Sequence, residues 1–144
     1  MGFEERLLEF EAVCRKEGLK ITHQRLEIFK ELLNSHDHPT VEKLYHRLQP
    51  KLPTISLDTV YRTLTTLEKH DLVVRVETGE SQARFEGRIE EHHHIVCKKC
   101  GEITDFNWKF PDEESLPDEI SSWGKIVKKT LTLHGFCEQC IQKE

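Results

Sequence analysis

Hydrophobic residues recur every three or four positions through the first half of the chain, which is the period of amphipathic helices. Gly18 follows the first such segment as a helix stop. Thr22, Thr40 and Ser56 stand where they can cap the first turns of three further helices. The expected inward-facing residues are Phe3, Leu7, Leu8, Phe10, Val13 and Cys14, then Leu26, Phe29, Leu32 and Leu33, then Val41, Leu44, Tyr45 and Leu48, and finally Leu57, Val60, Leu64 and Leu67.

After Asp71 the period changes to two, which is typical of strands. Residues 72–77 and 82–86 are predicted to form a hairpin around a turn at 78–81. Helices followed by a hairpin indicate a winged helix-turn-helix domain over residues 1–86, and residues 87–91 are the predicted hinge.

The remaining residues, 92–144, are predicted to form a small unit of mixed helix and strand, so the fold class is α+β. Strands are expected at Ile95–Val96, at 103–106 and at 126–133, with a helix over 112–123 that Pro117 interrupts early. Its edge strands indicate pairing with a second copy of the chain.

Composition limits the location of the protein and the nature of any DNA-binding surface. No apolar run approaches the ~20 residues of a membrane span and the N-terminus is acidic, so we expect no membrane partner and a cytoplasmic protein. The net charge is −5, and residues 1–86 carry 13 basic against 15 acidic side chains. DNA binding therefore requires a local basic face.

Two Cys-x-x-Cys pairs form the clearest chemical signal. Cys97 and Cys100 precede Gly101, which eases a tight turn, and Cys137 and Cys140 lie near the C-terminus. Four thiolates suit a closed tetrahedral zinc site with a structural role. Two disulfides, an iron centre and a redox pair are the alternatives, although the redox interpretation lacks its usual Trp-Cys-Gly-Pro context.

Imidazoles and carboxylates indicate a second, separate site. His92 and His94 share one strand face while Cys97 has the opposite parity. Asp105 follows on the next strand, Glu86 ends the hairpin and His38 lies between two helices. Such ligands suit Fe²⁺, Mn²⁺, Zn²⁺ or Ni²⁺, whereas a histidine triplet alone is often just a polar strand end.

The fourth predicted helix can read DNA with its polar face. Thr59, Arg62 and Thr66 lie near one another at helical spacing, and Tyr61, Thr63 and Thr65 complete this face. Hydroxyls reach phosphates, and a guanidinium contacts phosphate or guanine. The alternative is an ordinary solvated helix surface.

These segments together resemble the ferric uptake regulator superfamily of bacterial metal-dependent transcription regulators. The resemblance rests on five motifs in order, KITHQRLEIFKELLNS with a following HPT, SLDTVYRTLTTLEKHDLV, ARFE, HHHIVCKKCG and GFCEQC. It implies a winged-helix domain, a dimerisation domain and a homodimer that represses by binding a palindromic double-stranded DNA operator. It also implies a regulator rather than an enzyme, with no organic cofactor.

The resemblance assigns residues to each role. Structural Zn²⁺ falls on Cys97, Cys100, Cys137 and Cys140. Regulatory Fe²⁺ or Mn²⁺, which Zn²⁺ can replace in vitro, falls on His38, Glu86, His92, His94 and Asp105. DNA contacts fall on Gln24, Arg25, Thr59, Tyr61 and Arg62. His93 and His134 remain as candidates for an accessory metal site.

The branch of the family depends on two carboxylates. Asp105 resembles the peroxide sensors, whereas Glu86 resembles the iron sensors. We expect a peroxide-sensing repressor, with iron-sensing and zinc-sensing repressors as alternatives.

Two other classes of protein fit less well. A zinc hydrolase or deaminase needs a His-x-Glu pattern, which the chain lacks. A metal-trafficking protein would leave residues 1–71 without a role.

Overall fold

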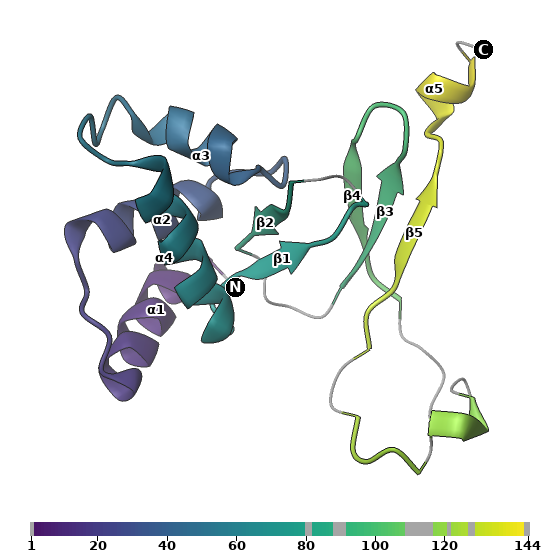
Figure 1. Cartoon of the computed structure of the whole chain (residues 1–144), viewed down its shortest axis with the longest axis horizontal. Helices are drawn as coiled ribbons and strands as arrows, with labels where there is room; N and C mark the ends of the chain where they lie inside the picture. The colour runs from purple at the N-terminus through teal and green to yellow at the C-terminus, as the bar shows by residue number, and fades with distance from the viewer. Residues whose placement is uncertain are drawn as a thin grey trace. The chain divides into compact units, whose positions relative to one another are not determined.

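A computed structural model describes residues 2–79, 82–87, 92–108, 117–120, 122–126 and 129–142. The chain divides into two compact units, Met1–Ile89 and Glu90–Glu144 (Figure 1). The predicted turn at 78–81 and hinge at 87–91 lie partly outside the described residues.

Four helices and a two-stranded sheet make up the described part of the N-terminal unit (Figure 1). They are α1 (Phe3–Glu17), α2 (His23–Leu33), α3 (Val41–Leu48), α4 (Leu57–Lys69), β1 (Val74–Val76) and β2 (Arg84–Glu86). The strands pair antiparallel, with Arg75 opposite Phe85. This order of helices and hairpin is the predicted winged helix-turn-helix arrangement.

Local chemistry determines where these helices begin and end. The side chains of Thr22, Thr40 and Ser56 each accept a hydrogen bond from an amide in the first turn of α2, α3 and α4, as predicted. Gly18 ends α1 with φ at 70°, a left-handed conformation that glycine adopts without strain.

The core of this unit follows the predicted pattern with a few exceptions. Its fully buried side chains include Phe10, Phe29, Leu32, Leu44, Leu48, Val60, Leu64 and Leu67. Phe3, Leu8 and Leu57 were expected to face inward, yet their exposed fractions are 39%, 65% and 43%. Leu8 follows Leu7 by one residue, so it points about 100° away around the helix. Thr63, expected on the polar face of α4, is buried.

Among the described residues of this unit, Arg6, Arg84 and Glu86 are charged residues that lie buried. Arg6 of α1 donates hydrogen bonds to the carbonyl oxygens of Leu72 at 2.7 Å and Gly87 at 2.6 Å. Its guanidinium also lies over the Phe29 ring. Apolar periodicity does not indicate this contact, because it joins residues that are far apart in the sequence.

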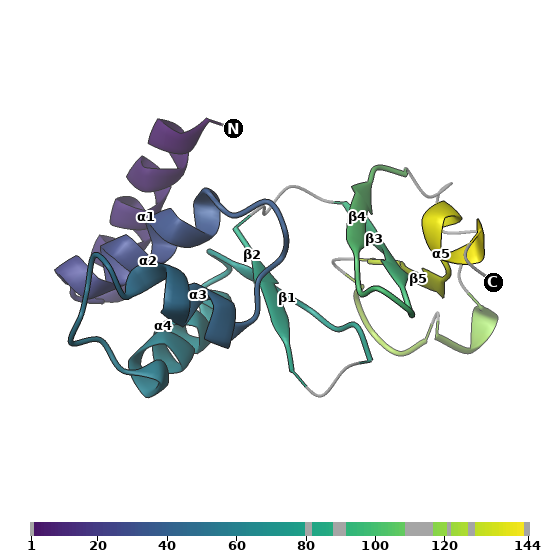
Figure 2. The ribbon, with the colours of Figure 1, turned by 90° about the horizontal axis from the view of Figure 1, so that it is seen from above.

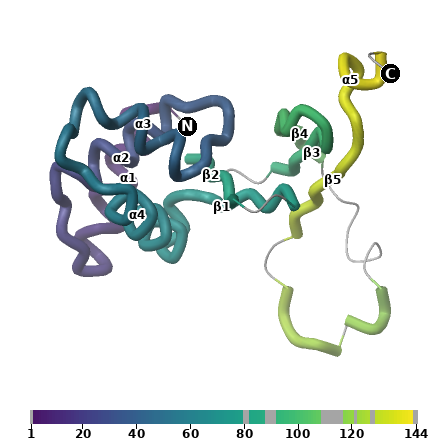
Figure 3. The backbone as a smooth tube through the Cα atoms, turned by 45° about the horizontal axis from the view of Figure 1, so that its top comes forward, coloured from purple at the N-terminus to yellow at the C-terminus, as the bar shows by residue number. Residues whose placement is uncertain are grey.

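The C-terminal unit is built on a three-stranded sheet (Figure 2). The central strand β3 (His93–Cys97) pairs antiparallel with β4 (Ile103–Phe106) and parallel with β5 (Thr132–Gly135). A 3-10 helix, η2 (Asp118–Ile120), precedes β5. The chain then runs from β5 into a short helix, α5 (Glu138–Gln142) (Figure 3).

Two predicted elements of this unit differ from the structure. The strand expected over 126–133 is observed at Thr132–Gly135, where the backbone pairs with β3, while residues 127–128 lie outside the described residues. Of the helix expected over 112–123, residues 112–116 and 121 lie outside the described residues, and the described part contains only η2. The prediction missed α5.

Within the residues that the structure describes, no helix combines the length and apolar character needed to cross a membrane.

Candidate metal centres and DNA-binding face

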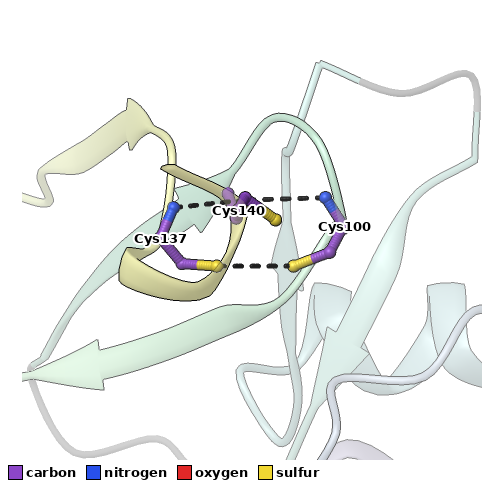
Figure 4. A group of neighbouring side chains, drawn as sticks. Cys100, Cys137 and Cys140 are labelled. Atoms are coloured by element: carbon purple, nitrogen blue, oxygen red, sulfur yellow. Dashed lines mark hydrogen bonds between the residues drawn. The ribbon is translucent and has the colours of Figure 1, made fainter. Parts of the chain in front are cut away.

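The four cysteines of the two Cys-x-x-Cys pairs converge in the C-terminal unit. Cys97 ends β3 and Cys100 lies in the turn after it, where Gly101 has φ at 78°, while Cys137 and Cys140 come from the segment around α5. The thiols of Cys100 and Cys137 point toward each other (Figure 4). The Sγ–Sγ distances are 3.7 Å between Cys97 and Cys140 and 3.9 Å between Cys100 and Cys137.

These distances fit a tetrahedral zinc ion. Zinc–sulfur bonds of about 2.3 Å place neighbouring sulfur atoms about 3.8 Å apart. All four sulfur atoms lie within 4.8 Å of one another, and all four cysteines are free thiols. A disulfide would require sulfur atoms about 2.05 Å apart. The cluster can therefore hold a metal ion, and it is not a pair of disulfides.

Proton affinities within the cluster are unequal. The amides of Cys100 and Cys137 donate to the Cys97 sulfur at 3.5 Å and 3.4 Å, and these bonds lower the pKa of the Cys97 thiol to about 6. The neighbouring Cys137 thiol and desolvation raise the pKa of Cys140 to about 12. Four thiolates held this close together need a bound metal to neutralise their charge.

In the N-terminal unit, one imidazole and one carboxylate form a possible pair of metal ligands. The Nε2 atom of His38 lies 2.8 Å from Oε2 of Glu86. Glu86 ends β2, and His38 lies in the loop between α2 and α3, where its φ is 52°.

A second group of nitrogen and oxygen donors lies in the C-terminal unit. His94 and Asp105 are partners across the β3–β4 pair, and Asp105 Oδ1 lies 3.4 Å from His94 Nε2 and 3.8 Å from His92 Nε2. The rings of His92 and His94 are 4.7 Å apart between centroids. Strand parity thus brings together the three donors that the sequence assigned to this unit.

The middle histidine of the triplet has a different role. The amide of Leu131 donates to His93 Nδ1 at 3.0 Å, so Nδ1 carries no proton. The other nitrogen, Nε2, then carries the proton and donates to the carbonyl oxygen of Trp108 at 2.9 Å. Because both nitrogens bond to the backbone, His93 joins three segments of the unit and has no nitrogen left for a metal. His134, the other accessory candidate, lies exposed on β5.

Four of the five predicted DNA contacts line one groove of about 470 Å³ in the N-terminal unit. Its walls come from the turn before α2, the first turn of α2 and the exposed side of α4, and they include Lys20, Thr22, Gln24, Arg25, Thr59, Arg62 and Thr66. The fifth, Tyr61, lies beside a separate groove next to the hairpin. Lys20 was missed because it lies outside the helices. This groove gathers three cations, Lys20, Arg25 and Arg62, although residues 1–86 carry more acidic than basic side chains.

Comparisons with known proteins support the resemblance inferred from the motifs. The model of the ferric uptake regulator family matches residues 16–134. The peroxide-responsive repressor PerR of Staphylococcus epidermidis is 36% identical over 143 residues, which cover 99% of this chain and 95% of that protein.

Two solved structures are similar over almost the whole chain. The Helicobacter pylori ferric uptake regulator Fur superposes with a TM-score of 0.78 and 30% identity, over 98% of this chain and 95% of that one. PerR from Streptococcus pyogenes superposes with a TM-score of 0.54 and 27% identity, over 92% of this chain and 90% of that one. With the family model matched over most of its length, the chain belongs to the ferric uptake regulator family and is a metal-responsive transcription regulator.

Proposed function

We propose that this protein is a repressor that binds a palindromic operator as a homodimer and senses peroxide through a regulatory Fe²⁺ or Mn²⁺ ion. The observation that carries the proposal is the pair of donor sets, since each unit offers imidazole and carboxylate groups that suit these metals. His38 and Glu86 come from the N-terminal unit, and the C-terminal unit contributes His92, His94 and Asp105. Zn²⁺ on the four cysteines is a separate structural ion.

The proposed ligands explain how a metal would control DNA binding. One ion shared by both donor sets would fix the angle between the winged-helix domain and the dimerisation domain, with residues 87–91 as the hinge. In a dimer this angle sets the spacing of the two α4 helices, which must enter successive major grooves about one helical turn apart. Metal affinity and operator affinity are then linked and must change together.

Support for direct DNA contact comes from the groove beside α4. Arg62 has a side chain that is 79% exposed, and it is paired with Asp58 one turn earlier at 2.9 Å. Arg25 and Gln24 begin α2, whose first-turn amides add a partial positive charge. This arrangement suits phosphate contacts from α2 and base or phosphate contacts from α4.

Support for the homodimer comes from the sheet of the C-terminal unit. Ile95 of β3 and Leu133 of β5 are register partners, and their exposed fractions are 42% and 43%. Two apolar side chains side by side on an open sheet face favour burial against a second copy.

The peroxide response would act on the ligands themselves. Bound Fe²⁺ would activate peroxide for breaking its O–O bond. A ring carbon of His38 or His92 would exchange its hydrogen for one oxygen atom, and the other peroxide oxygen would leave as water, so that the imidazole supplies the two electrons. The altered ring would no longer bind the metal, so the domains would lose their fixed angle and release DNA.

Operator affinity is the direct test. It would be measured with Fe²⁺, Mn²⁺ and Zn²⁺ in turn, with and without peroxide. The masses of the protein's peptides would then be determined by mass spectrometry. We expect peroxide to abolish binding by the Fe²⁺ form only, with one oxygen atom gained on the peptide of His38 or His92. The Mn²⁺ form, which should be insensitive, is the control. Loss of specific DNA binding on removing the regulatory metal would exclude an enzyme or a trafficking protein.

An iron-sensing repressor is the second candidate, and Glu86 favours it, as does the similarity to the Helicobacter pylori regulator. Operator binding by the Fe²⁺ form that survives peroxide, with no oxygen gained, would select this candidate.

A further inference from the structure

An arginine of β2 holds the backbone of the loop that carries His38. Arg84 Nε donates to the carbonyl oxygen of His38 at 2.6 Å, and Nη2 donates to that of Asp37 at 2.7 Å. Two successive carbonyls therefore share one guanidinium. Beside it, the amide of Phe85 donates to the Pro39 carbonyl at 2.9 Å. The end of the loop is thus attached to β2 at three carbonyls in a row.

The backbone of this loop needs such support. His38 has φ at 52°, in the left-handed region that a residue with a Cβ atom adopts only at a cost. Arg47 of α3 also donates to both carboxylate oxygens of Asp37 and to the hydroxyl of Ser35 at 3.0 Å. Contacts from β2 and α3 together therefore maintain a conformation that the loop sequence alone disfavours.

The same strand also determines where the His38 side chain lies. Residues two apart on a strand point to one face, so Arg84 and Glu86 lie side by side on β2. Arg84 holds the backbone of His38, and Oε2 of Glu86 lies 2.8 Å from its Nε2 atom. A shift of the loop would separate the imidazole from the carboxylate.

We infer that Arg84 is a positioning residue for the regulatory metal site, because it sets the geometry of the His38 and Glu86 donors before the ion binds. The inference rests on the proposed function, in which these two residues are ligands. Groups that orient metal ligands typically change affinity by 10- to 100-fold when they are replaced.

The positive charge alone does not explain why residue 84 is an arginine and not a lysine. A guanidinium presents several donors in a rigid plane and can bond to two carbonyls at once, whereas the ammonium of a lysine is a single point on a flexible chain. Arg84→Lys therefore keeps the charge and removes the paired hydrogen bonds. Arg75→Lys is the matched control. Arg75 lies on β1, bonds to Glu68 at 3.1 Å and packs over the Phe85 ring, so it contacts the same strand without touching the His38 loop.

The test uses the full-length, zinc-loaded chain and Mn²⁺ as the probe. Mn²⁺ affinity would be measured by electron paramagnetic resonance for wild type, Arg84→Lys, Arg75→Lys and His38→Ala. We expect Arg84→Lys to bind Mn²⁺ at least about tenfold more weakly, with wild-type zinc content, and Arg75→Lys to bind it like wild type. The visible spectrum of the Co²⁺-substituted Arg84→Lys protein should move toward that of His38→Ala. A loss of stability alone would not produce that shift.

The outcomes separate the inference from the proposed function. Wild-type protein that binds no Mn²⁺, or His38→Ala that binds it normally, would overturn the proposed site and this inference with it. Normal Mn²⁺ affinity in Arg84→Lys, together with weak binding by His38→Ala, would overturn the role of Arg84 alone. An equal loss in Arg75→Lys would also overturn it, since the effect would then be general to the hairpin.

Discussion

At the scale of single residues, three consecutive histidines, His92 to His94, have different environments. His92 and His94 face Asp105, while His93 between them bonds through both ring nitrogens to backbone groups. Strand alternation separates them, because neighbouring residues point to opposite faces. The role of a histidine in this triplet is therefore set by its parity and by what the other segments bring to each face.

We predict that His93→Leu destabilises the C-terminal unit by about 1–3 kcal/mol, because it leaves the Leu131 amide and the Trp108 carbonyl without their partner. Both tryptophans lie in this unit, so their fluorescence during urea unfolding reports on it. His134→Gln, at an exposed position, is the control and should leave the transition unchanged. An unaltered urea midpoint for His93→Leu would contradict the structural role.

Asp37 in the His38 loop accepts hydrogen bonds from Arg47 on both carboxylate oxygens. Its hydrogen bonds from Arg47 hold the pKa of the Asp37 carboxyl below its ordinary value. A lowered carboxyl pKa means that the ion pair stabilises the fold above about pH 3.9, the ordinary value for Asp. That stabilisation is lost as the pH falls through the folded-state pKa.

Arg47→Ala should therefore raise the Asp37 pKa toward its ordinary value, which a carboxyl NMR titration would measure. The Asp37 side chain is 46% exposed, so solvent screening keeps the loss of stability at pH 7 below about 1 kcal/mol. Lys51→Ala removes a nearby cation that contacts Glu31 and should not move this pKa. An unchanged titration in Arg47→Ala would show that the ion pair is absent in solution.

At the scale of elements, β5 and α5 depend on distant partners. The α5 helix spans only 5 residues, far fewer than the ~12–15 that an isolated helix needs in water. Its Cys140, together with Cys137 just before it, meets Cys97 and Cys100 from the end of β3. Metal on these thiols would connect the last segment of the chain to the central strand of the sheet.

Removal of zinc should therefore unfold α5 and loosen β5. A structural zinc contributes on the order of 10 kcal/mol of binding free energy. We expect Cys137→Ser to lose the metal, and backbone amides of residues 132–142 to exchange with deuterium within seconds. Cys14→Ala alters a buried thiol of the other unit, so it should retain zinc and protection. Preserved protection in metal-free protein would contradict this account.

At the scale of the whole molecule, the proposed function depends on connections between units and between copies. The α4 groove lies in one unit, whereas the exposed sheet face of Ile95 and Leu133 lies in the other. A palindromic operator is bound more tightly by a protein that presents two such grooves at a fixed spacing. Dimer formation and DNA affinity should therefore fall together when that face is altered.

We predict that Ile95→Glu gives a monomer at micromolar concentration, because a charge in an apolar interface must be desolvated without a partner. Sedimentation velocity measures the change, and operator affinity should fall by more than about tenfold, since half of the contacts are lost. Lys99→Glu introduces the same side chain at an exposed turn position and should remain dimeric. A dimeric Ile95→Glu variant would place the interface elsewhere.

The sequence by itself determined the elements that local interactions specify. The four helices, their Ser and Thr caps and the Gly18 stop depend on neighbours within about four residues, so periodicity predicted them. The two Cys-x-x-Cys pairs could also be recognised from the sequence, because each presents two thiols from one turn. Motif order then indicated the family.

Only the tertiary structure decided the features that arise between distant segments. The late start of β5, the short α5 and the backbone bonds of His93 all depend on the pairing of β3 with segments about 15 to 45 residues away. The same holds for Arg84, whose two acceptors lie 46 and 47 residues earlier in the chain. No local pattern encodes such contacts, because the residues that form them meet only after the strands have paired.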